Sequence, residues 1–188
     1  MDEMVKAALR KWPNVPHCYG WLALGNRGVW YMRDDRAQAA GAFPQPLGSA
    51  IQHDKLLDFI HRNYARDERG AWYFQNGPQR VYVELQSAPY VWRIHSTLSG
   101  GWRVTAQNGL GLDVANDATV RAVWTDEIGR LFFNTDSGFG LVHSLDTGLA
   151  AEVIEQGPWP VQELPFADMP ARFGYVLKPQ PAAPAEVT

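Results

Sequence analysis

Short runs of aromatic residues, separated by glycine and proline, most constrain what this chain can fold into. The sequence has eight Trp, seven Tyr and eight Phe, together with 17 Gly and 13 Pro in 188 residues. Aromatic side chains suit a pleated, half-buried surface, whereas frequent Gly and Pro interrupt helices. The pattern therefore predicts many strands and turns with few helices.

The first third of the chain contains three local patterns. Residues 1–11 carry a weak apolar stripe, which predicts a short helix. Residues 21–24 and 29–32 flank a Gly-Asn-Arg-Gly loop, which predicts a β-hairpin. Residues 52–66 follow a Ser-x-x-Gln capping box and place apolar side chains at helical spacing, so they predict the main helix.

The remaining patterns are those of short strands. Residues 71–74, 81–85 and 90–94 are separated by turn residues, and the last two runs alternate in polarity, which predicts a three-stranded meander. A short helix is expected at 149–156, after Thr147. Further short strands are predicted at 102–106, 120–124, 131–133, 141–145 and 173–177.

Two segments of the chain echo each other. Residues 67–74 and 126–133 both have the pattern Asp-Glu-x-Gly-x followed by three large apolar residues. Residues 81–85 then line up with 141–145 after one inserted residue, and the hairpin at 26–32 is a fainter third copy. Since Gly readily adopts the positive φ that tight turns require, the echo predicts a repeated turn-and-strand unit. The alternative is that unrelated aromatic hairpins share this appearance.

The order of several motifs resembles that of a known family. The motifs are Ser49-Ala50-Ile51, Tyr64-Ala65-Arg66-Asp67-Glu68-Arg69-Gly70, Trp72-Tyr73-Phe74, Pro78-Gln79-Arg80-Val81 and Ala88-Pro89-Tyr90, after an upstream Pro16-His17-Cys18 and Gly28-Val29-Trp30-Tyr31. Together they resemble, over residues 12–95, an uncharacterised proteobacterial family known as a domain of unknown function. The resemblance implies two related domains built from β-hairpins and a helix, and a loose link to signalling. It carries over no catalytic residue, and the Asn76-Gly77 pair departs from the pattern of that family.

These patterns together predict an α+β, β-rich fold of two small related domains of antiparallel hairpins, with one main helix in the first. We expect an N-terminal hairpin-helix-meander domain at 12–95 and a C-terminal β-rich domain at 96–178. The Pro- and Ala-rich segment 179–188 is expected to be a disordered tail.

Composition excludes several classes of function. A net charge of −3 and a pI near 5.9 lack the basic excess that non-specific nucleic-acid binding needs. No run approaches the 18 apolar residues of a membrane span, and residues 1–11 lack the apolar core of a secretory signal. The single cysteine, Cys18, excludes an internal disulfide and a thiolate metal cage. We therefore expect a cytoplasmic protein without nucleic-acid or membrane partners.

The sequence offers no strong catalytic or metal-binding pattern. His53, Asp54, Asp58 and His61 share the main helix, but a closed zinc site needs four converging ligands and a solvated helix face is the simpler interpretation. Cys18 follows His17 directly, and neighbours in a strand point to opposite faces. No catalytic residue, metal or cofactor is therefore predicted.

The leading functional hypothesis is a non-catalytic binding or regulatory protein. Aromatic rings interleaved with arginine are common anchors of binding sites. The predicted ligand- or partner-binding residues are Tyr73, Asn76, Arg80, Tyr82 and Arg93, which would hold a protein partner or a small anionic ligand. A self-associating subunit is a third hypothesis. The alternative is a small hydrolase or transferase that uses Cys18, His17 or His95.

Overall fold

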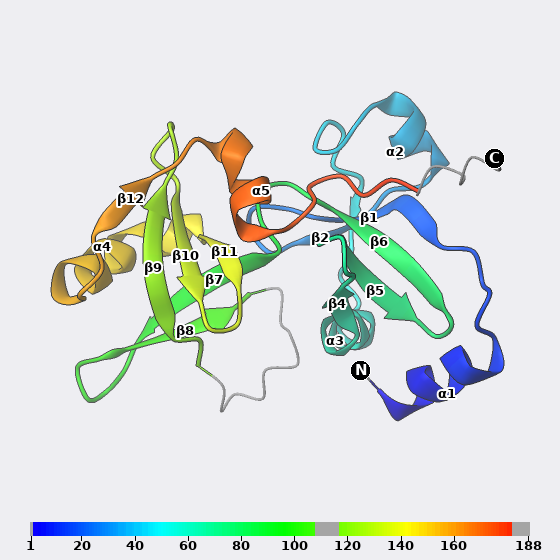
Figure 1. Cartoon of the computed structure of the whole chain (residues 1–188), viewed down its shortest axis with the longest axis horizontal. Coiled ribbons are helices and arrows are strands. Elements are labelled where there is room, and N and C mark those ends of the chain that lie inside the picture. The colour runs from blue at the N-terminus through cyan, green and yellow to red at the C-terminus, as the bar shows by residue number, and fades with distance from the viewer. Residues whose placement is uncertain (1, 108–116, 182–188) are drawn as a thin grey trace.

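The computed structural model describes residues 2–107 and 117–181, and these residues form two six-stranded sheets and five α-helices. The sheets lie side by side along the long axis of the molecule (Figure 1). The predicted α+β, β-rich fold with two related halves is confirmed.

The first sheet joins two antiparallel hairpins through a parallel pair. Its strand order is β3-β2-β1-β6-β5-β4, in which the hairpins β1-β2 and β5-β6 meet where β1 runs parallel to β6. Its strands are β1 (Cys18–Leu24), β2 (Trp30–Met32), β3 (Ser49–Ala50), β4 (Tyr64–Arg66), β5 (Trp72–Asn76) and β6 (Gln79–Leu85).

The second sheet repeats this arrangement. Its order is β12-β9-β10-β11-β7-β8, and the hairpins β7-β8 and β10-β11 meet where β7 runs parallel to β11. The β1-β2 hairpin therefore corresponds to β7-β8, so its assignment as a third copy of the Asp-Glu turn is wrong. The strands are β7 (Tyr90–Ser96), β8 (Trp102–Ala106), β9 (Val120–Thr125), β10 (Leu131–Thr135), β11 (Phe139–Val142) and β12 (Val161–Glu163).

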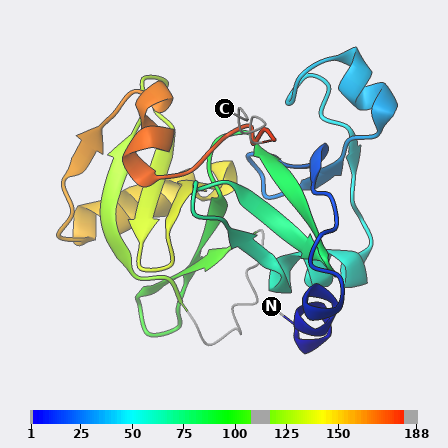
Figure 2. The same ribbon diagram turned by 45° about the vertical axis from the view of Figure 1, so that its right-hand side comes forward.

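Helices cover these sheets unequally. They are α1 (Glu3–Lys11), α2 (Asp35–Ala40), α3 (Asp54–Arg62), α4 (Thr147–Gln156) and α5 (Met169–Phe173), with the 3₁₀ turns η1 (Ser144–Asp146) and η2 (Phe166–Asp168). In the second sheet, α4 lies on one face and α5 on the other (Figure 1). In the first sheet α3 covers one face, and α1 lies beside α3 (Figure 2). The other face of the first sheet carries the C-terminal segment and an open cleft.

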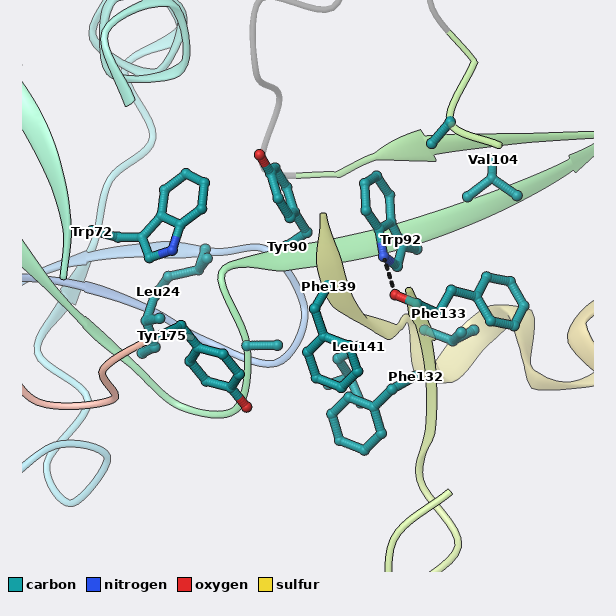
Figure 3. Close-up of a cluster of buried hydrophobic side chains, with 14 of the residues drawn as sticks. Leu24, Trp72, Tyr90, Trp92, Val104, Phe132, Phe133, Phe139, Leu141 and Tyr175 are labelled. Atoms are coloured by element: carbon teal, nitrogen blue, oxygen red, sulfur yellow. Dashed lines mark hydrogen bonds between the residues drawn. The ribbon is translucent and has the colours of Figure 1, made fainter. Parts of the chain in front are cut away.

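One hydrophobic core runs through both sheets. Trp72 of β5 packs edge-to-face on Tyr90 of β7, with ring centroids 5.3 Å apart (Figure 3). The Tyr175 hydroxyl donates a hydrogen bond to the Ser87 carbonyl at 2.9 Å and anchors the connection between the sheets. Burying large aromatic rings from both halves in one core favours a fixed relation between the sheets.

Three local predictions are wrong in their details. The main helix begins at Asp54, where the Nδ1 of His53 accepts the Leu56 N–H, so the capping box at Ser49 does not form. It ends at Arg62 because the next residues form β4, which pairs with β5. Residues 173–177 form no strand, since α5 ends at Phe173 and an irregular segment follows.

The predicted three-stranded meander is also wrong. Alternating polarity correctly indicates a strand at β7, but β7 pairs with β8 and β11 of the second sheet rather than with β6. Alternating polarity determines which side chains lie on each face of a strand, but it does not determine which strand pairs with it. Sheet membership thus changes between Leu85 and Tyr90, and the domain boundary between residues 95 and 96 stays a prediction.

Two further expectations concern the C-terminal tail and membrane-spanning helices. Most of the expected tail, residues 182–188, lies outside the described residues, and Pro179 at its start is buried. Within residues 2–107 and 117–181, no helix is both long and apolar enough to cross a membrane.

Candidate functional site

A cleft of about 830 Å³ opens on the face of the first sheet opposite α3. We call it the tyrosine–arginine cleft. Its walls come from the segment before β1, from the β4-β5 turn, from β5 and β6, and from the C-terminal segment. The lining residues are His17, Tyr19, Arg66, Asp67, Glu68, Arg69, Tyr73, Arg80, Tyr82 and Pro181.

Three tyrosines form the floor of the cleft. Tyr73 on β5 lies directly opposite Tyr82 on β6, and their rings contact edge-to-face at 5.8 Å. Tyr19 on β1 stacks on Tyr82, with ring centroids 4.6 Å apart and planes 6° from parallel. Tyr73 and Tyr82 are buried among their neighbours, which fixes their rings. The floor is therefore a rigid aromatic surface.

Asp67 ties the β4-β5 turn to this floor. One carboxylate oxygen accepts the backbone N–H groups of Arg69 and Ala71, at 3.0 and 2.9 Å. The other accepts the Tyr82 hydroxyl at 3.0 Å. Burial opposes the charge of Asp67, but these hydrogen bonds outweigh it and lower the pKa below its usual 3.8. Asp67 is thus a charged structural acceptor at neutral pH rather than a proton donor.

Arg80 supplies an accessible positive charge above the floor. Its guanidinium carbon lies 4.5 Å from the centre of the Tyr73 ring, in cation–π geometry. Burial disfavours the charge, but a hydrogen bond with Tyr82 and the nearby Tyr73 outweigh it and raise the pKa of Arg80. Among the described residues no carboxylate lies within ion-pair distance of Arg80, so its charge remains available to a ligand.

Two further side chains define the electrostatics at the edge of the cleft. Arg69 is half-exposed; it forms a long ion pair with Asp67, at 3.4 Å, and hydrogen bonds with Tyr82 and Tyr19 raise its pKa. His17 contacts the edge of the Tyr82 ring at 5.8 Å. Burial, and then the positive charges of Arg80 and Arg69, lower the pKa of His17 below 6.5. His17 is therefore neutral at pH 7, and the arginines carry the positive charge of the cleft.

The structure brings together three of the five predicted binding residues. Tyr73, Arg80 and Tyr82 all line the cleft. Asn76 is exposed at the end of β5 and points to the opposite face, because it lies three positions after Tyr73 and side chains alternate along a strand. Arg93 lies in the second sheet, where its Nε donates to Asp146 at 2.6 Å. The five predicted residues therefore do not share one face of one sheet.

The sequence interpretation missed several lining residues. Tyr19 reaches the cleft because β1 runs parallel to β6, which joins segments about sixty residues apart in the chain. No local sequence pattern predicts such a pairing between distant segments. Asp67 does have a sequence signal, namely the recurrence of the Asp-Glu-x-Gly pattern at Asp126.

The residues of the hydrolase or transferase hypothesis lie apart. His17 lines the tyrosine–arginine cleft, whereas Cys18 lines an apolar pocket on the opposite face of the same sheet. His95 is exposed on β7 of the second sheet and lies 3.0 Å from the Thr105 hydroxyl. A thiol nucleophile needs a base within hydrogen-bond reach, and neither histidine is placed to serve Cys18.

The two histidines of the predicted main helix, His53 and His61, have structural partners. His53 caps the helix, and the Nε2 of His61 accepts the indole N–H of Trp30 at 2.9 Å. Within the described part of the chain, no three His, Cys, Asp or Glu side chains are grouped so that they could hold a metal ion.

One family model matches most of this chain, and the description of that family assigns no function. The model of the family described as "Protein of unknown function (DUF2946)" matches residues 1–180. No curated protein matches the sequence. Among solved structures, a DUF1285 family protein from Silicibacter pomeroyi DSS-3 is similar, with 13% identity and a TM-score of 0.45. The similarity covers 81% of this chain and 85% of that protein.

Proposed function

This chain belongs to the family described as "Protein of unknown function (DUF2946)", and from that premise we propose that it is a non-catalytic binding protein. Its ligand in this proposal is a small anion with a planar ring, held in the tyrosine–arginine cleft. Release and capture of such a ligand would serve a regulatory role in the cytoplasm.

The observation that carries the proposal is the position of Arg80 above the tyrosine floor. Arginine held on an aromatic ring presents its remaining N–H groups to an anion, in a geometry suited to carboxylate or phosphate. The Tyr73 and Tyr82 rings, which meet edge-to-face, offer apolar contacts beside that charge. The cleft volume falls in the range of small-ligand sites.

The charge of the cleft supports an anion with few negative groups. Arg66, Arg69 and Arg80 line it with Asp67 and Glu68, so the arginines exceed the carboxylates by one. Asp67 is already engaged by the turn and by Tyr82. The positive excess is thus concentrated at the guanidinium groups, where an anion gains most from charge-assisted hydrogen bonds.

Phenyl phosphate is a suitable probe because it combines one anionic group with one ring. We expect calorimetric titration to detect binding to the wild-type protein and a loss of about tenfold in affinity in Arg80→Gln, the value of one charged hydrogen bond. The matched control is Arg121→Gln, an exposed arginine on β9 outside the cleft.

Two results would count against this proposal. Equal affinity of wild type and Arg80→Gln for phenyl phosphate would remove the cleft as the binding site. Loss of the folded state in Arg80→Gln, detected by circular dichroism, would assign Arg80 a structural role; Tyr73→Leu, which removes the ring beneath Arg80, then tests the cleft by the same titration.

A further inference from the structure

A second cavity, of about 400 Å³, lies where the two sheets meet. We call it the junction cavity. Trp72 of β5 and Arg66 of β4 contribute from the first sheet, and Tyr90 of β7 and Phe139 of β11 from the second. Tyr175 of the C-terminal segment completes the aromatic walls (Figure 3). The cavity is therefore built jointly by both halves of the chain.

An unpaired hydrogen-bond donor is buried in the wall of this cavity. Trp72 is 8% exposed, and its indole N–H has no partner among the described residues. Figure 3 shows the indole nitrogen on the edge of the ring that is turned toward Leu24 and Tyr175. A buried N–H without a partner costs free energy. The nitrogen itself has almost no accessible surface, so a ligand oxygen in the cavity would reach it, and offset this cost, after a small displacement of the indole ring.

Two other buried tryptophans have a partner for their indole N–H. The indole N–H of Trp30 donates to His61 at 2.9 Å, and that of Trp92 donates to the Phe133 carbonyl at 3.1 Å. Trp124 is also unpaired, but it does not line the junction cavity. It is the combination of an unpaired donor with an adjoining cavity that distinguishes Trp72.

Charged groups on the cavity wall narrow the class of ligand. Arg66 is exposed, and no carboxylate of the described residues pairs with it. Asp136 also lines the cavity, and its pKa is lowered chiefly by the backbone N–H of Thr119, so it stays charged at neutral pH. The Asp136 carboxylate would repel a doubly charged phosphate. A singly charged carboxylate can reach Arg66 and the indole N–H and place a ring against the aromatic walls.

We infer that the junction cavity is a second binding site, which takes a small aromatic carboxylate. The carboxylate accepts the Trp72 indole N–H and pairs with Arg66, and its ring packs among Trp72, Tyr90 and Phe139. Although Arg66 borders both hollows, this inference does not depend on the tyrosine–arginine cleft, because Trp72 lines the junction cavity and not the cleft.

Benzoate is the probe, and the tryptophan indole signals in ¹⁵N–¹H spectra are the readout. The Trp72 signal is assigned in spectra of the wild-type protein and is checked by its loss in Trp72→Phe. We expect millimolar benzoate to move this signal downfield, as a new hydrogen bond requires, while the Trp124 signal stays in place. Arg66→Gln should weaken benzoate binding about tenfold.

The variants separate this inference from the proposed function. Arg80→Gln, which impairs the cleft, should leave the benzoate titration of the Trp72 signal unchanged. A Trp72 signal that does not move in wild-type protein would overturn the inference, whether or not Trp72→Phe folds. An equal shift with uncharged benzyl alcohol, unaffected by Arg66→Gln, would likewise reject carboxylate recognition.

Discussion

The two sheets have the same central order of strands but use one of their faces differently. Strands β2-β1-β6-β5-β4 of the first correspond to β8-β7-β11-β10-β9 of the second. The pairing registers of the two hairpins agree as well. Phe74 and Phe133 are equivalent positions of the repeated segments, and their cross-strand partners, Val81 and Gly140, each lie seven positions further along the chain. The two copies therefore align from the Asp-Glu turn onward without the inserted residue that the sequence comparison introduced.

The corresponding turns are built alike. Asp126 accepts the backbone N–H groups of Ile128 and Arg130, just as Asp67 accepts those two and four residues ahead of it. Gly129 and Gly70 have φ of +78° and +81°, which glycine adopts at little cost. The repeated sequence thus specifies a repeated turn.

The side chains beyond the turn decide whether the adjoining face is open. Tyr73 and Tyr82 of the first sheet correspond to Phe132 and Leu141 of the second, by the paired registers. Phe132 is fully buried and stacks on Phe139, beneath the η2-α5 segment. The second sheet thus has an apolar, covered face where the first has tyrosine hydroxyls and a cleft. The same scaffold is thus closed by packing in the second sheet and open in the first, where we propose that a ligand binds.

The largest expected effect separates the arginines of the two turns. Arg130 donates to the completely buried Asp126 at 2.6 Å and lies 4.4 Å from the Phe166 ring. Arg130→Ala leaves that carboxylate unpaired and should lower the free energy of unfolding by about 3 kcal/mol. Arg69→Ala in the open copy, where the pair is long and half-exposed, should cost less than about 1 kcal/mol. Urea unfolding of both variants checks this, and equal losses would contradict the contrast.

A smaller effect is expected from exchanging the aromatic residues of the two faces. Phe132→Tyr places a hydroxyl in a covered apolar site and should destabilise the protein by about 2 kcal/mol. Tyr73→Phe, at the floor of the open cleft, should change stability by less than about 0.5 kcal/mol. The measurement is thermal unfolding followed by circular dichroism. A tolerated Phe132→Tyr would mean that water reaches the face beneath η2-α5.

The smallest expected effect is a pH dependence shared by the two halves. Burial lowers the pKa of His61 near the first sheet and of His143 near the second below 6.5. Each accepts a hydrogen bond, from the Trp30 indole and the Leu145 N–H respectively. The unfolded chain then binds more protons, so stability is complete above pH 6.5 and falls as the pH drops below it.

Variants of His61 and His143 measure how much each histidine contributes to the pH dependence of stability. His61→Gln and His143→Gln should each flatten part of the decline in unfolding midpoint between about pH 7 and pH 5. His95→Gln, at an exposed position, is the control. An unchanged slope in both test variants would show that the neutral histidines do not support the fold.

The local features of the fold could be predicted from the sequence, because they depend on neighbouring residues. The turn at Asp67 recurs at Asp126 with the same spacing, and alternation along β6 places Tyr82 on one face and Val83 on the other. The family resemblance rested on the same short motifs, and the match over residues 1–180 confirms it. Spacing along one strand sets its two faces before any partner is chosen.

Only the tertiary structure decided which distant segments pair with one another. The parallel pairing of β1 with β6 brings Tyr19 onto Tyr82, and the pairing of β7 with β11 removes Arg93 from the first sheet. Several partners would satisfy the alternation of each strand equally well. The choice among them depends on how completely the whole chain buries its aromatic faces, which is a property of all its segments together. The sequence by itself therefore determined the turns and the faces, and the packing of the complete chain determined which faces meet and which one stays open.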